Sequence, residues 1–126
     1  MSLEDDGPRP PFAPNSAEQP SSARITELND RLRVHRVGGR VVMTSGIDAL
    51  GSVALAAILV KLTAFSDFNR DNDPHGERDL GLFDHGGERI LWKIDAYDQA
   101  MQGGSPDPAD PAVTTRVLTI MLAEEY

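Results

Sequence analysis

The feature that most restricts the fold is an alternating stretch, LGLFDHGGERILWKIDAY, at residues 80–97. Large apolar residues occupy every second position in its second half, at Ile90, Trp92 and Ile94. A period of two is the pattern of a strand with one buried face. Gly86 and Gly87 lie between the two halves, where a tight turn needs residues that tolerate positive φ. The stretch therefore predicts a β-hairpin whose inner face joins the core.

Two helices and a strand are predicted before the hairpin. Ile25, Leu28 and Leu32 recur at helical spacing, so a first helix is expected from about residue 22. RVVMT, at residues 40–44, is β-branched and predicts a short buried strand. SVALAAILVKLTAF follows, at residues 52–65, and predicts a helix that is apolar all round and therefore central.

The C-terminal segment, residues 113–122, allows two assignments. Its β-branched content favours a strand, whereas Asp110 and Pro111 form a typical helix start, with a capping side chain followed by proline at the first helical position. We expect the helix. The resulting order is α-β-α-β-β-α, with a β-hairpin and a central apolar helix, which is an α+β fold in one domain over residues 22–126.

Composition restricts the class of protein. Residues 1–21 hold five of the nine prolines and few large apolar groups, which predicts a disordered, Pro-rich tail. The chain has 126 residues, no cysteine and a formal net charge of -8, which disfavours direct binding to nucleic acid. The start lacks a secretory pattern, and the longest apolar run, residues 53–60, is far shorter than the ~20 residues of a membrane span. We therefore expect a cytoplasmic protein.

Three stretches, DNDPHGERDLG, WKIDAYD and GSPDPADPAVTTRVLTIMLAEEY, resemble the domain-of-unknown-function family 3768. The resemblance covers roughly residues 24–126. It implies a small bacterial protein of the kind carried by plasmids and other mobile elements, and it brings no assigned activity or catalytic residue. Arg78 stands where the family pattern has a histidine, and His75 where it has a tyrosine, which argues against a family-wide active site in this stretch.

The most charged segment is DFNRDNDPHGERD, residues 67–79. An EF-hand frame that begins at Asp67 fails because Arg78 occupies position 12, where calcium loops have a bidentate glutamate. A looser Mg²⁺ or Mn²⁺ site remains as an alternative, as does a loop in which asparagine and aspartate cap the backbone. A third interpretation is an acidic recognition surface. The metal alternative uses Asp71, Asp73, His75 and Asp79, and the recognition surface uses Asp67, Asp71, Asp73, Glu77 and Asp79.

The segment WKIDAYD, residues 92–98, is the second candidate. Alternation predicts that Trp92 faces the core while Lys93 and Asp95 pair on the opposite side. Leu91 stands where a metal-dependent nuclease would need a glutamate, so no nuclease pattern is present. The residues of this segment that we expect to contribute to binding are Lys93, Asp95, Tyr97 and Asp98.

These features favour a small, acidic, non-catalytic interaction protein with no cofactor. We expect a mobile-element accessory factor that binds and inhibits a basic or nucleic-acid-binding host protein, for example a defence nuclease. The alternative function is a metal-dependent hydrolase, or a metal-binding module, built on the acidic residues 67–79 together with Asp95 or Asp98.

Overall fold

The computed structural model describes residues 18–126, so most of the predicted tail, residues 1–21, lies outside the described residues. The first helix, α1, spans Glu18–His35 and begins four residues before the predicted start at residue 22. It takes in Pro20, which lies in the first turn, where a helix tolerates proline because the amide groups there have no partner within the helix.

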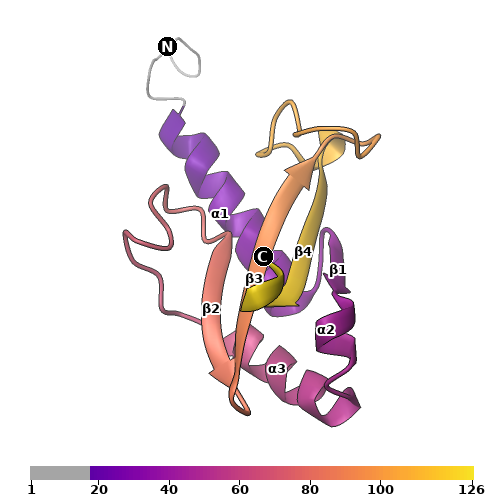
Figure 1. The fold of residues 1–126 in the computed structure, drawn as a ribbon. Helices are drawn as coiled ribbons and strands as arrows, with labels where there is room; N and C mark the ends of the chain where they lie inside the picture. The colour runs from indigo at the N-terminus through magenta and orange to yellow at the C-terminus, as the bar shows by residue number, and fades with distance from the viewer. Residues whose placement is uncertain (1–17) are drawn as a thin grey trace, which may run out of the picture.

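A four-stranded sheet with the order β1-β4-β3-β2 forms the centre of the fold (Figure 1). β4 runs parallel to β1 and antiparallel to β3, and β3 runs antiparallel to β2. The remaining elements are two helices and two short 3₁₀ turns. The strands are β1 (Arg40–Met43), β2 (Leu80–His85), β3 (Glu88–Tyr97) and β4 (Thr115–Leu122), and the other elements are α2 (Ser45–Asp48), α3 (Ser52–Ala64), η1 (Pro111–Val113) and η2 (Ala123–Glu125). The α+β class is therefore confirmed.

The predicted hairpin is present. β2 and β3 pair from Leu80 opposite Lys93 to His85 opposite Glu88. Gly86 and Gly87 connect them with φ values of 56° and 82°, as expected for a two-residue turn with positive φ at both positions. Gly81 lies opposite Trp92, and a Cβ atom at position 81 would lie 2.5 Å from Nε1 of the indole. A glycine at position 81 therefore leaves room for the Trp92 ring.

The predicted C-terminal helix is wrong, because Thr115–Leu122 form strand β4. Asp110 does act as a cap: its side chain accepts a hydrogen bond from Ala112 N at 2.9 Å. The capped element is only the short turn η1, which ends at Val113. β4 then lies between β1 and β3, and ladders on both sides outweigh a local helix start in a segment rich in β-branched residues.

The core lies between the sheet and the helices α1 and α3. One face of each central strand points into it, as the hairpin pattern predicted, and Trp92 is fully buried there. α1 crosses behind this face, and the C-terminal turn η2 lies over the other face, in front of β3 (Figure 1). The buried cluster consists of Leu32, Ile47, Ile58, Leu62, Ile90, Trp92, Ile94, Leu118 and Ile120.

Two predictions about burial are wrong. The strand expected to be buried, β1, forms one edge of the sheet, and three of its four residues are exposed. Helix α3, which was expected to be central because its sequence is apolar all round, lies at the surface. Ile58 and Leu62 face the core, while Val53 and Val60 are 84% and 69% exposed. A two-layer fold covers only one face of each helix, so an apolar sequence does not by itself make a helix central.

Candidate functional site

The acidic segment forms the connection between α3 and β2, and its two halves are held differently. In the first half, Asn69 Oδ1 accepts hydrogen bonds from the backbone N–H groups of Asp71 and Asn72, at 2.8 and 3.2 Å. Asn72 Oδ1 accepts one from Asn69 N, and its Nδ2 donates to Asp67 O. The amide side chains thus hold this turn, as side-chain capping of loops predicts. Asp67 and Asp71 remain exposed.

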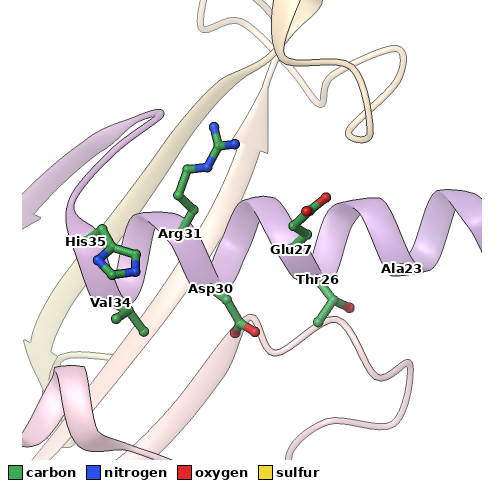
Figure 2. Close-up of a pocket in the computed structure, with 7 residues that line it drawn as sticks. All are labelled: Ala23, Thr26, Glu27, Asp30, Arg31, Val34 and His35. Atoms are coloured by element: carbon green, nitrogen blue, oxygen red, sulfur yellow. The ribbon is translucent and has the colours of Figure 1, made fainter.

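The second half is fastened to α1. Thr26 Oγ1 donates to Gly76 O at 2.6 Å, Asn29 Nδ2 donates to Glu77 O at 2.9 Å, and Arg78 Nη1 donates to Asp30 Oδ2 at 3.0 Å. In Figure 2, Thr26 and Asp30 point from α1 toward this loop. Arg78 also stacks over the Phe68 ring, 5.2 Å from its centroid. These contacts fix where Glu77 and Asp79 lie.

A hollow of about 480 Å³ runs along α1 (Figure 2). All of the described residues that line it come from this one helix. Thr26 and Asp30, which line it, are already bonded to the loop. The hollow is therefore a groove on the surface of one helix, and two of its polar side chains hold the acidic loop.

A smaller and more enclosed pocket, of about 220 Å³, lies where α1, the acidic loop, β3 and β4 meet. We call it the Arg116 pocket. Arg116 lies opposite Ala96 on the core side of the sheet and is only 2% exposed. Its Nε donates to Asn29 Oδ1 at 2.8 Å, and its Nη2 donates to Pro108 O. The pocket is lined by Ile25, Asn29, Glu77, Asp79, Ile94, Asp95, Ala96, Pro108 and Arg116.

Two carboxylates of the acidic loop enter this pocket half-buried. Burial raises the pKa of Glu77, and the neighbouring Asp79 raises it further. Burial also raises the pKa of Asp79, against the effect of its own backbone N–H group, which lowers it. No side chain among residues 21–126 donates a hydrogen bond to either carboxylate. Both carboxylates are therefore partly desolvated acceptors that no other side chain among these residues satisfies.

The buried guanidinium of Arg116 is also incompletely satisfied. Within the part of the chain that the structure describes, no carboxylate lies within 4.0 Å of it. Its third nitrogen, Nη1, has no hydrogen-bond partner there. The enclosed side-chain atoms without partners in that region are Arg33 Nε and Trp92 Nε1, so Arg116 Nη1 is not fully enclosed by protein. Buried charges are ordinarily paired, and this residue, which lines the pocket, keeps one donor atom without a partner.

The predicted pairing of Lys93 and Asp95 is confirmed. Lys93 Nζ lies 2.5 Å from Asp95 Oδ2 on the sheet face opposite the core. This hydrogen bond raises the pKa of Lys93 more than burial lowers it. Asp95 borders the Arg116 pocket, but its carboxylate lies beside Lys93 on the face of the sheet away from Arg116.

The other predicted site residues lie apart from the pocket. Asp73 Oδ1 accepts a hydrogen bond from Arg78 N at 2.9 Å, and His75 is exposed. Asp98 Oδ1 accepts one from Gln102 N in the connection after β3, and Tyr97 lies opposite Thr115. Among the residues that the structure describes, no three or more histidine, aspartate and glutamate side chains are placed to hold a metal ion. Asp71, Asp73, His75 and Asp79 therefore do not provide a ligand set for the metal alternative.

Sequence reasoning missed Asn29, Pro108 and Arg116. One signal pointed to Arg116: it is a charged residue at the start of the apolar run VLTIML. In a strand, its position places it on the same face as Leu118 and Ile120. Assigning a helix to this segment hid that pattern.

The chain belongs to the family described as "Protein of unknown function (DUF3768)", whose model matches residues 43–125, about two thirds of the chain. The match includes Glu77, Asp79, Asp95 and Arg116 and leaves out the whole of α1. No curated protein and no solved structure matches the chain. Among residues 18–126, every helix is too short or too polar to cross a membrane.

Proposed function

We propose that this protein is a non-catalytic interaction protein that recognises a basic partner through the acidic loop and the adjoining Arg116 pocket. The partner is a host protein that handles nucleic acid, such as a defence nuclease. Binding takes place in the cytoplasm and blocks the surface that would otherwise contact phosphates. The protein acts as an accessory factor of mobile elements.

The observation that supports this proposal best is the way in which the loop presents its charge. Asp67 and Asp71 are exposed on a turn that Asn69 and Asn72 hold in place, and α1 fastens the following segment. A fixed set of carboxylates loses little conformational entropy on binding, which favours recognition. The net charge of -8 favours recognition by a second route, because long-range attraction accelerates the approach of a basic partner.

Affinity capture from a bacterial lysate tests the proposal, with three immobilised forms of the protein. The first is wild type. The second carries Asp67→Asn with Asp71→Asn. The third is a matched control, Asp48→Asn with Glu124→Gln, which loses the same charge at exposed positions outside the loop. We expect one stoichiometric basic protein on the wild type and the control, and a reduced amount on the loop variant.

The captured protein is then purified, and its activity on nucleic acid is measured with and without the acidic protein. Inhibition that weakens in the loop variant supports the proposal. The association rate should fall steeply with salt, because charge steering is screened over about 8 Å at physiological ionic strength. Equal capture by all three forms, or a captured protein whose activity is unchanged, contradicts it.

A further inference from the structure

We propose that the Arg116 pocket receives one basic residue of the partner, whose side chain donates hydrogen bonds to Glu77 and Asp79 while its backbone carbonyl accepts one from Arg116 Nη1. This inference rests on the proposed function and names the group that the pocket recognises. The side chain is an arginine or lysine, and its own backbone carbonyl completes the contact.

The groups left unsatisfied in the pocket decide which chemistry fits. Glu77 and Asp79 are half-buried acceptors to which no side chain among residues 21–126 donates, and Arg116 Nη1 is a donor without an acceptor there. A buried polar group without its partner costs about 1–3 kcal/mol, so a ligand that supplies the missing partners is favoured. Such a ligand must donate to two carboxylates and accept from one guanidinium.

Charge restricts the ligand further. Arg116 offsets one of the two loop carboxylates, and Lys93 already pairs with Asp95, so the pocket keeps an excess of one negative charge. A phosphate or carboxylate ligand would face the carboxylates of Glu77 and Asp79 together. A metal ion would need a set of carboxylate or histidine ligands that residues 18–126 do not bring together. A cationic donor group remains.

Size restricts it as well. A volume of about 220 Å³ has room for about seven waters at ~30 Å³ each. That is smaller than the pockets of about 300–1,000 Å³ that enclose metabolites of drug size. One extended side chain fits this volume. Guanidinium suits the site best, because its planar fork can reach two carboxylates at once.

Small probes test the pocket without the partner. N-acetylarginine N-methylamide, which carries both a guanidinium and a backbone carbonyl, is titrated into the full-length protein while amide resonances are followed by NMR. We expect saturable shifts at residues that line the pocket, with millimolar affinity, and no such change at the loop tip. The absence of saturable pocket shifts at tens of millimolar overturns the inference.

Two related probes separate the two arms of the contact. The citrulline analogue keeps the shape but lacks the charge, and should bind at least about tenfold more weakly, since a charge-assisted hydrogen bond is lost. n-Butylguanidine keeps the single guanidinium charge and lacks the carbonyl, so it should also bind more weakly than the arginine probe. Equal affinity of the citrulline analogue overturns the requirement for a cation, and equal affinity of n-butylguanidine overturns the role of Arg116 Nη1.

Variants locate the binding and separate this inference from the proposed function. Glu77→Gln with Asp79→Asn should abolish the probe shifts, whereas Asp67→Asn with Asp71→Asn, which removes the same charge at the loop tip, should leave them unchanged. Retained amide dispersion shows that each variant is folded. If the probe binds but no partner is captured, the inference about the pocket is supported and the proposed function is refuted. A partner whose affinity is unaffected by Glu77→Gln with Asp79→Asn refutes the pocket alone.

Discussion

The two halves of the acidic loop each carry acidic side chains and one arginine, and they differ in how their polar groups are satisfied. In the first half, Asn69 and Asn72 saturate the backbone, and the carboxylates face water. In the second half, the backbone is bonded to α1, and Glu77 and Asp79 line a pocket with a buried guanidinium to which they form no ion pair. The first arrangement stabilises a turn. The second lowers stability locally, which is typical of a site made for a ligand.

The largest effect should come from removing the residue on which the second half depends. Arg116→Met deletes the donors to Asn29 Oδ1 and Pro108 O and leaves a buried amide without its partner. We expect a loss of about 2–4 kcal/mol in the free energy of unfolding, measured by urea denaturation. Arg116→Lys keeps the charge without the fork and should recover only part of it. A loss below about 1 kcal/mol would show that the guanidinium is not a structural tie.

A smaller loss should follow when the caps of the first half are removed. Asn69→Ala with Asn72→Ala deletes four hydrogen bonds between side chains and the backbone of the turn. Because the turn is exposed and water replaces part of these bonds, we expect the free energy of unfolding to fall by about 1–2 kcal/mol in all. Hydrogen exchange should accelerate at residues 67–73 and stay unchanged at residues 76–79, which α1 holds. Equal acceleration in both segments would contradict their independence.

Replacing Glu77 should raise the free energy of unfolding, whereas the two substitutions above should lower it. Its pKa is raised in the folded protein, so the folded state holds this proton more tightly than the unfolded chain does. The associated stability is present below the unfolded pKa and is lost as the pH rises through the folded pKa. Glutamine has no proton to lose, so Glu77→Gln should be more stable than wild type at pH 7. Thermal melts from pH 3 to 8 measure the difference.

The pH profile provides the control for this substitution. The advantage of Glu77→Gln should shrink as the pH falls and vanish below about pH 4, where the carboxyl group is protonated in both states. Asp71→Asn, which removes a carboxylate at the exposed tip, is the matched variant for comparison. A stabilisation by Glu77→Gln that is constant over the whole range would point to packing and not to titration.

The features that depend on residues close together in the chain could be predicted from the sequence. The hairpin follows from alternation around Gly86 and Gly87, and the pairing of Lys93 with Asp95 follows from a period of two. β4 was mistaken for a helix because its cap at Asp110 is local, while the strands that hold it lie elsewhere in the chain. Local propensity gives way where tertiary pairing is available.

The candidate site was predictable only in part. Composition marked residues 67–79 as important, and it could not divide them into a satisfied half and an unsatisfied half. That division depends on Arg116 and Asn29, which are 87 positions apart and meet only in the folded protein. A contact over such a distance leaves no local spacing to detect, so the carboxylates were found and the guanidinium between α1 and β4 was not.

The smallest effect on stability, and the sharpest test of the comparison, concerns the exposed carboxylates. Asp67 and Asp71 donate and accept nothing through their side chains among residues 21–126. Asp67→Asn with Asp71→Asn should therefore change the free energy of unfolding by less than about 0.5 kcal/mol. The same pair should slow association with the basic partner several-fold at low salt and leave the dissociation rate nearly unchanged, because exposed charges act on the approach of the partner. Stopped-flow or surface-based kinetics at several salt concentrations measure both rates.

A matching fall in the association rate for Glu77→Gln, whose carboxylate is half-buried, would show that the two halves act as one charged surface. A faster dissociation for Glu77→Gln, with association preserved, would show that the first half attracts the partner and the second half holds it.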